Sequence, residues 1–222
     1  MPLITDWKRE YEQRGALWIH DGNPKRPHAL LTSGNHSGGF FNSELVMEDP
    51  SLLHAAGFAL HEKLESAGLD MEAVHRVVGP AMGAITIAHC VAFHIGEQRG
   101  RPCLRAYTEK EKTEGEGEIM VFRRTMIKEF EYILAVEDVL TTGGSVKSTA
   151  KAVTNVGGVN LPFIAVLVNR SGLENVNGSK VISLVNRPMP IWKPDQCQLC
   201  NQGSVALRPK GKENWERLKA SY

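Results

Sequence analysis

The sequence lacks a large excess of either charge, and this absence argues against binding to nucleic acid or to an anionic membrane. Its 222 residues carry 26 Lys and Arg against 25 Asp and Glu. A nearly neutral chain lacks the broad positive field that attracts nucleic acid or an anionic membrane surface. We therefore expect no nucleic-acid partner, and any basic site must be local.

Long hydrophobic runs are also missing. Apolar stretches such as Phe163–Val168 are far shorter than the roughly 20 residues that a membrane span requires. The opening segment MPLITDWKREYEQ contains no apolar signal-peptide core. We expect a soluble, cytoplasmic protein with no membrane partner.

Cysteine is scarce, with only Cys90, Cys103, Cys197 and Cys200. Four residues at these positions do not form a regular disulfide framework, and a chain of this length does not need one. Cys197 and Cys200 are the one pair with metal-ligand spacing, and no second C-x-x-C or H-x-x-x-H motif completes a set of four ligands. The pair is interpreted as structural or incidental, with half of a shared zinc site and redox chemistry as alternatives.

Repeats and low-complexity linkers are absent, and the chain alternates between strand and helix patterns, which favours a parallel α/β sheet. Asp49 and Pro50 predict the start of a helix that Gly68 ends, because Asp can cap free amides and Pro suits the first helical position. Further helices are expected from Ala84 to about Gly96 and from Gly144 to about Asn155. Strands are expected at residues 76–78, 102–107, 119–122, 132–136, 161–168 and 181–185.

The segment from Thr108 to Glu118 contains five glutamates, two lysines and no apolar residue. Such a segment cannot pack into a core, and it is predicted to be a mobile loop.

The most informative segment is YILAVEDVLTTGGS, from Tyr132 to Ser145. A buried strand ends in Glu137 and Asp138, and a turn rich in hydroxyls and glycine then opens a helix. In parallel α/β folds, ligands bind at that end of the sheet. Successive backbone amides and a helix N-terminus favour an anion, so the segment predicts a phosphate site with two carboxylates placed to reach the hydroxyls of an attached sugar.

Other phosphate motifs fit this chain less well. A P-loop requires a glycine directly before Lys147, and the segment Gly79-Pro-Ala-Met-Gly83 is not a G-x-G-x-x-G fingerprint. A mere loop-capping role for Glu137 and Asp138 is disfavoured, because adjacent acids after an apolar strand are costly unless they are exposed and used.

The segment VEDVLTTGGS resembles the binding motif for 5-phosphoribosyl-1-pyrophosphate (PRPP) of type I phosphoribosyltransferases. The order of motifs over about residues 28–175 resembles the orotate enzymes of that family: TSGNHSGGFFN from Thr32, the Gly79–Gly83 loop, a flexible loop at Lys112–Gly117, and Asn169-Arg170. The resemblance implies one phosphoribosyltransferase domain over residues 1–222, with a central, mostly parallel sheet flanked by helices. Its parts would be an N-terminal helix and hood or lid (about 1–48), a PRPP-binding core (about 49–190) and a C-terminal tail (about 191–222).

The resemblance also implies a role for each motif. Glu137 and Asp138 would bind the ribose hydroxyls, directly or through Mg²⁺, and stabilise the cationic transition state. Mg²⁺ would be bound mainly through PRPP, with Asp138 as a candidate protein ligand. The 5-phosphate would be bound by the loop of Thr141, Thr142, Gly143, Gly144 and Ser145. The pyrophosphate would be bound by the loop of Gly79, Pro80, Ala81, Met82 and Gly83.

The remaining roles concern the base and the leaving group. Lys112 would neutralise the leaving pyrophosphate as part of a loop that closes over the reacting bond. Arg170 would pair with the carboxylate of orotate, with a surface salt bridge as the alternative. Phe40, Phe41 and Thr142 would contact the base, although the two phenylalanines equally suit an ordinary core. By resemblance, the enzyme would be a homodimer.

Several positions depart from the orotate pattern. Thr32 stands where a base-contacting lysine is usual, Met82-Gly83 where a tyrosine-lysine pair is common, and Glu114 where histidine is common. Glu109 stands near another usual lysine position. These departures leave two alternatives to orotate transfer, a phosphoribosyltransferase for another base and a non-catalytic PRPP-binding regulator. A generic phosphosugar-binding domain is a third, although it leaves the Gly79–Gly83 loop without a task.

Overall fold

The computed structural model describes residues 4–113 and 117–222, and the chain divides into two compact units. The first, here the core unit, consists of the chain up to Lys8 and of Met47–Arg187. The second, here the terminal unit, consists of Arg9–Val46 and Pro188–Tyr222. The sequence suggested separate hood and tail regions within one domain, whereas the structure combines them in one unit.

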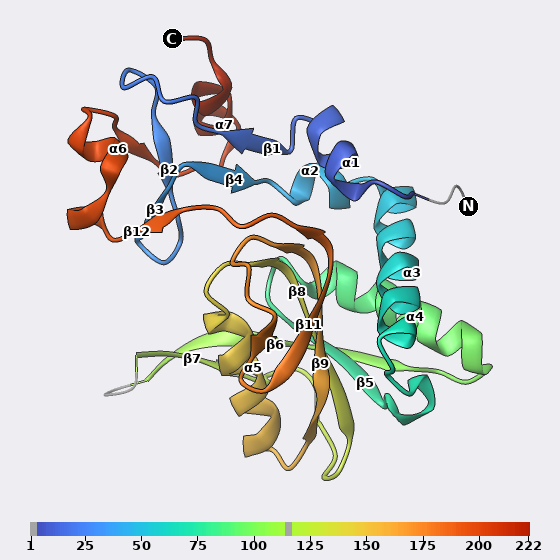
Figure 1. Ribbon diagram of the computed structural model, residues 1–222. Coiled ribbons are helices and arrows are strands. Elements are labelled where there is room, and N and C mark those ends of the chain that lie inside the picture. Colours follow the sequence, from blue (N-terminus) through green and yellow to red (C-terminus); the bar gives the residue numbers. More distant parts are fainter. Residues whose placement is uncertain (1–3, 114–116) are drawn as a thin grey trace. The chain divides into compact units, whose positions relative to one another are not determined.

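The core unit is built on one sheet (Figure 1). Within the described residues it has seven strands, in the order β10-β11-β9-β8-β5-β6-β7. The five inner strands, β11 to β6 in that order, pair in parallel, and each edge strand pairs antiparallel with its neighbour. This confirms the expected α/β class and mostly parallel sheet. The strands are β5 (Arg76–Pro80), β6 (Leu104–Thr113), β7 (Gly117–Val121), β8 (Tyr132–Leu140), β9 (Val159–Asn169), β10 (Asn175–Val176) and β11 (Ser179–Asn186).

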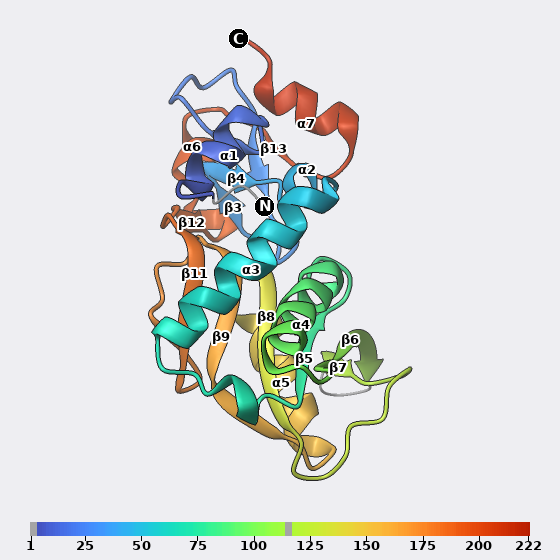
Figure 2. The same ribbon diagram turned by 90° about the vertical axis from the view of Figure 1, so that its right-hand side faces the viewer.

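Helices cover both faces of this sheet (Figure 2). Helices α3 (Pro50–Ser66) and α4 (Ile85–Arg99) lie on one face, and α5 (Gly144–Asn155) lies on the other. A short 3-10 helix, η1 (Met71–Ala73), precedes β5. Val146 of α5 packs with Ala135 of β8 and Ile164 of β9, so the helix that follows the predicted phosphate loop is fixed to the sheet by buried apolar contacts.

The start of α3 confirms its local sequence signals. The Asp49 carboxylate accepts hydrogen bonds from the amides of Ser51 (2.9 Å) and Leu52 (3.4 Å), and Pro50 occupies the first turn. After the helix, Gly68 adopts a left-handed φ of +97° that most side chains avoid. Leu60 and Leu64, one turn apart, are buried.

The prediction of a loop over residues 108–118 is wrong for its described part. β6 and β7 form an antiparallel hairpin in which Lys112 pairs with Glu118 and Thr113 with Gly117. Charged side chains are accommodated at this edge of the sheet because they form ion pairs between the two strands. One example is the 2.7 Å ion pair between Lys110 Nζ and Glu118 Oε2. Residues 114–116, including Glu114, lie outside the described residues.

The terminal unit contains two small sheets. β1 (Leu17–Ile19) pairs with β4 (Gly39–Phe41), and the described residues form a second sheet in the order β12-β3-β2-β13. Its strands are β2 (His28–Leu30), β3 (His36–Ser37), β12 (Ile191–Trp192) and β13 (Ala206–Leu207). The other elements are α1 (Trp7–Gln13), which begins in the core unit, α2 (Glu44–Met47), η2 (Pro194–Gln196), α6 (Gln198–Asn201) and α7 (Lys212–Lys219).

The two ends of the chain share the core of this unit. Trp18 packs with Trp215 and Leu218 of α7, and the Trp18 indole Nε1 donates a 2.8 Å hydrogen bond to the Leu218 carbonyl. Residues as far as 200 positions apart therefore form one core.

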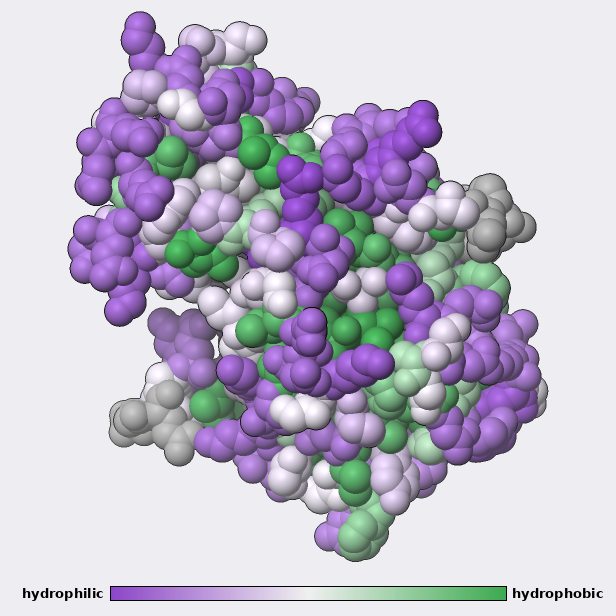
Figure 3. Space-filling view, in the orientation of Figure 1, coloured by the Kyte–Doolittle hydropathy of each residue, from purple (hydrophilic) through white to green (hydrophobic). Residues whose placement is uncertain are grey.

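The surface in Figure 3 is mainly hydrophilic, and its hydrophobic residues form separate patches. No helix within residues 4–113 and 117–222 has the length and apolar character needed to cross a membrane.

Candidate functional site

The order of the sheet places a topological switch point, a candidate ligand site, between β5 and β8. These strands are parallel neighbours, but the chain leaves them in opposite directions. From β5 it runs through α4 to β6 on one side, and from β8 through α5 to β9 on the other. In open α/β sheets, ligands bind outside the carboxyl ends of the strands at such a switch point. Both of the glycine loops that the sequence singled out follow these two strands.

Two acids occupy the carboxyl end of β8. The side chain of Asp138 is half-buried, whereas Glu137 is only 7% exposed. Burial raises the pKa of the Glu137 carboxyl well above its usual range, and the neighbouring Asp138 carboxylate raises it further. The sequence argument expected both acids to be exposed, so the structure corrects it for Glu137. The site therefore combines an accessible carboxylate with a buried acid that resists ionisation.

The loop after β8 leads into the N-terminus of α5. Gly143 is the N-cap of this helix, with a φ of 77°, and it has no side chain with which to cap the first amides. A Cβ at Gly143 would also lie 3.0 Å from Val176 Cγ1, so the position favours glycine on two grounds. Thr142, Gly144 and Ser145 are exposed, and Thr141 is half-buried. Uncapped helix amides beside exposed hydroxyls are an arrangement suited to binding a phosphate.

The loop after β5 approaches Asp138 of β8. A Cβ at Gly83 would lie 2.5 Å from Asp138 Oδ2, and a Cβ at Gly79 would lie 2.6 Å from the Cβ of Ala84. The loop contains a cis peptide between Ala81 and Met82, and the Ala81 amide donates a 2.7 Å hydrogen bond to the Thr108 carbonyl. Met82 is 83% exposed. The Gly83 backbone therefore lies so close to the Asp138 carboxyl group that a side chain at position 83 would clash with it.

Comparison with known proteins decides the family. The family model of the phosphoribosyl transferase domain matches residues 48–198. The chain belongs to the phosphoribosyltransferase family. It is 32% identical over 186 residues to the orotate phosphoribosyltransferase of Desulforamulus reducens, a match that covers 84% of this chain and 89% of that protein. It is 33% identical over 197 residues to that of Acidithiobacillus ferrooxidans, with 87% and 93% covered.

Solved phosphoribosyltransferase structures share the fold. Orotate phosphoribosyltransferase from Aeropyrum pernix superposes with a TM-score of 0.57 at 23% identity, covering 80% of this chain and 92% of that one. Adenine phosphoribosyltransferase from Thermoanaerobacter pseudethanolicus gives a TM-score of 0.51 at 19% identity, covering 67% and 88%. Since enzymes for a pyrimidine and for a purine both match, these likenesses establish the fold and leave the base open.

Cationic residues of the core unit lie in contrasting environments. Lys112 is exposed on β6, opposite Glu118. Arg170 follows β9 and is 1% exposed, which excludes a surface salt bridge, and its amide donates a 3.1 Å hydrogen bond to the Leu140 carbonyl at the end of β8. Burial lowers the pKa of Arg170 to about 10, so the side chain stays protonated at neutral pH. Arg99 and Arg101 are at the opposite, amino end of β6, where they bond to carbonyls such as those of Val74 and Glu72.

The two phenylalanines lie in the terminal unit. Phe41 is 2% exposed and meets Tyr11 edge-on, with ring centroids 5.3 Å apart. Phe40 is half-buried and lies 5.8 Å from the Trp215 ring. Both therefore have packing roles in the core of that unit, and their contact with a base stays a prediction.

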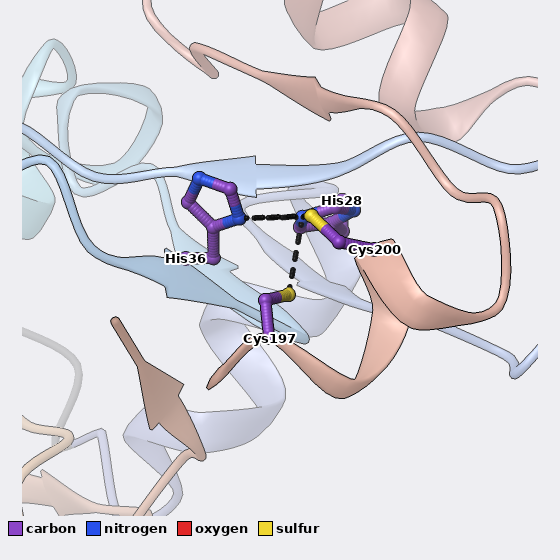
Figure 4. A group of neighbouring side chains, drawn as sticks. All are labelled: His28, His36, Cys197 and Cys200. Atoms are coloured by element: carbon purple, nitrogen blue, oxygen red, sulfur yellow. Dashed lines mark hydrogen bonds between the residues drawn. The ribbon is translucent and has the colours of Figure 1, made fainter. Parts of the chain in front are cut away.

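Two residues that sequence reasoning missed lie beside the cysteine pair. His28 and His36 lie close to Cys197 and Cys200 in the terminal unit (Figure 4). The spacing of seven residues between the histidines does not match a C-x-x-C or H-x-x-x-H pattern. The two histidines share one face because Leu30 pairs with His36 across the strands, and nothing in the sequence signals this register.

Proposed function

We propose that this phosphoribosyltransferase transfers the 5-phosphoribosyl group of PRPP to orotate, giving orotidine 5′-monophosphate and pyrophosphate. One observation carries the proposal: the Gly79–Gly83 loop, the Asp138 carboxylate and the α5 N-terminus meet at the switch point of the sheet. This arrangement offers separate places for a pyrophosphate, a ribose and a 5-phosphate. The choice of orotate rests on the names of the relatives that match most of the chain.

Each part of PRPP has a proposed partner. The amides at the start of α5 and the hydroxyls of Thr141, Thr142 and Ser145 would bind the 5-phosphate. The backbone of the Gly79–Gly83 loop would bind the pyrophosphate, because its glycines allow close approach. Asp138 and Glu137 would then face the ribose hydroxyls, between the two phosphate sites.

The reaction needs charge stabilisation more than proton transfer. The bond between C1′ and the pyrophosphate oxygen breaks, and its electron pair leaves with pyrophosphate. N1 of orotate bonds to C1′ and releases its proton to solvent. Asp138 would stabilise the positive charge that develops on the ribose, and Glu137 would join it once ligand binding favours its ionised form. Lys112, exposed on the hairpin, would neutralise charge on the leaving group.

Mg²⁺ belongs to the proposal as a cofactor. Carboxylate and phosphate oxygens are the ligands that Mg²⁺ prefers, and the half-buried Asp138 offers such an oxygen. Asp138 and the oxygens of PRPP would hold the ion, which supplies positive charge against the pyrophosphate when bound. Chelation of Mg²⁺ should therefore abolish product formation, and a rate that EDTA leaves unchanged would contradict this role.

The test is the identity of the nucleotide product. Purified protein is incubated with PRPP, Mg²⁺ and a mixture of orotate, uracil, hypoxanthine, guanine, adenine and nicotinate, and the products are identified by mass spectrometry. Orotidine 5′-monophosphate should dominate. Another nucleotide would replace orotate with the true acceptor, and PRPP binding without any product would favour a non-catalytic PRPP-binding protein. A homodimer is part of the proposal, and sedimentation of the purified chain tests it.

A further inference from the structure

Four side chains with metal-binding atoms converge in the terminal unit (Figure 4). Their ligand atoms all lie within 4.8 Å of one another. His28 Nε2 is 3.0 Å from His36 Nδ1 and 3.4 Å from Cys197 Sγ. Cys200 Sγ is 3.5 Å from His28 Nε2 and 3.3 Å from His36 Nδ1. His28, His36 and Cys197 are buried, Cys200 is half-buried, and both cysteines are free thiols.

The topology of the small sheet creates this cluster. β2 and β3 are antiparallel, with Leu30 opposite His36, so His28 lies diagonal to His36 on the same face. β12 pairs with β3, and β13 pairs with β2. The chain from β12 to β13 must therefore cross the β2–β3 pair, and it carries Cys197 and Cys200 at η2 and α6.

The dimensions match a tetrahedral zinc site. With Zn–S bonds of about 2.3 Å and Zn–N bonds of about 2.0–2.1 Å, the edges of a tetrahedron between ligand atoms are roughly 3.3–3.8 Å. Four of the six separations between ligand atoms are 3.0–3.5 Å, close to these edges, and the other two are within 4.8 Å. Two thiolates and two imidazoles form a closed set of four protein ligands, which is typical of structural rather than catalytic zinc.

A hydrogen-bond chain behind the cluster orients His28. Ser204 Oγ donates to the Arg26 carbonyl at 2.6 Å, so its single proton is used there. The 2.8 Å contact between Ser204 Oγ and His28 Nδ1 must then be donated by the imidazole. This bond fixes the tautomer in which Nε2 has a lone pair directed at the cluster, as the outer partners of metal-binding histidines do.

We propose that His28, His36, Cys197 and Cys200 bind one structural Zn²⁺ that holds the C-terminal segment on the β2–β3 pair. The strands of this sheet are two or three residues long, at or below the lower end of the usual range, so a cross-link between them would add stability. The ligands from the two ends of the chain are 161–172 positions apart. Zinc would join these ends as a cross-link that the reducing cytosol does not break.

The experiment measures metal in the full-length protein, purified without chelators or added zinc. Elemental analysis should find about one zinc per chain, since four protein ligands complete one tetrahedral shell. The double variant C197S/C200S should lose this zinc, whereas C103S, which removes a cysteine of the core unit, should retain it. Zinc retained by C197S/C200S, or lost equally from C103S, would overturn the proposal.

Cobalt substitution of the wild-type protein tests the same four ligands even if the double variant does not fold. Co²⁺ bound in place of zinc should give the strong visible absorption of tetrahedral coordination, together with thiolate-to-cobalt charge-transfer bands. H36N should weaken these spectra, and His54→Asn, which changes a histidine of α3, should not. The zinc site is refuted if the purified protein contains no stoichiometric zinc and its cobalt form lacks thiolate bands. A disulfide between Cys197 and Cys200 would also refute it.

Discussion

Replacing Gly83 by alanine tests the contact between the loop after β5 and the acid of β8. The added Cβ would lie 2.5 Å from Asp138 Oδ2 and 2.7 Å from Asp138 Cγ, so either the loop or the carboxylate must move. Overpacking of this kind costs about 1–3 kcal/mol. We expect PRPP to bind only to the arrangement in which the loop lies against Asp138. The cost of restoring that arrangement should then weaken the affinity for PRPP by roughly 5- to 150-fold.

A double-mutant cycle separates this clash from other effects. Asp138→Ala removes the atoms that the new methyl group meets, so Gly83→Ala should then cost much less stability. The coupling between the two changes, measured by urea unfolding, should be about 1–3 kcal/mol. Gly38→Ala is the control, because its Cβ would meet nothing closer than 3.5 Å. If Gly83→Ala costs the same with and without Asp138, the proposed contact is wrong.

Three further predictions concern single side chains. Because burial raises the pKa of Glu137 well above 4.5, the folded protein holds a proton that the unfolded chain releases, so the free energy of unfolding should fall as the pH rises above about 4.5. Urea unfolding should show a smaller fall in Glu137→Gln, and parallel profiles would contradict the raised pKa. Ser204→Ala should weaken Zn²⁺ affinity by roughly 10- to 100-fold in a chelator competition, and an unchanged affinity would remove Ser204 from the zinc site. Lys112→Ala should lower kcat/KM for PRPP by about tenfold or more, whereas Lys110→Ala, whose ammonium pairs with Glu118, should not; equal effects would argue against a specific role for Lys112.

Local signals in the sequence predicted the parts of the fold that depend on neighbouring residues. The Asp49 cap and the helix at Gly144–Asn155 both follow from residues within one turn. The strand before Glu137 was also predicted, because a mostly apolar run ending in acids is characteristic of a buried parallel strand. These elements position the candidate PRPP site, so its main loops could be located without the structure.

Long-range pairing was beyond the reach of such signals. The charged segment at Thr108–Thr113 was interpreted as a loop, because the sequence does not reveal that Lys110 pairs with Glu118 across a hairpin. Likewise, Cys197 and Cys200 lie near His28 and His36 only because β12 and β13 pair with β3 and β2. The burial of Glu137 is a property of the packed sheet, and it reversed the expectation that this acid is exposed.

The most direct test of the central claim is the rate at which orotidine 5′-monophosphate forms from PRPP and orotate. This rate is measured for the wild-type protein, for Asp138→Asn, and for Glu213→Gln, which changes a surface residue of α7 and serves as the control. The wild type and Glu213→Gln should form the nucleotide at similar rates. Asp138→Asn should lose at least about 100-fold in kcat/KM, because a carboxylate beside the developing charge is removed. Equal rates for all three proteins, or no nucleotide from the wild type, would contradict the account.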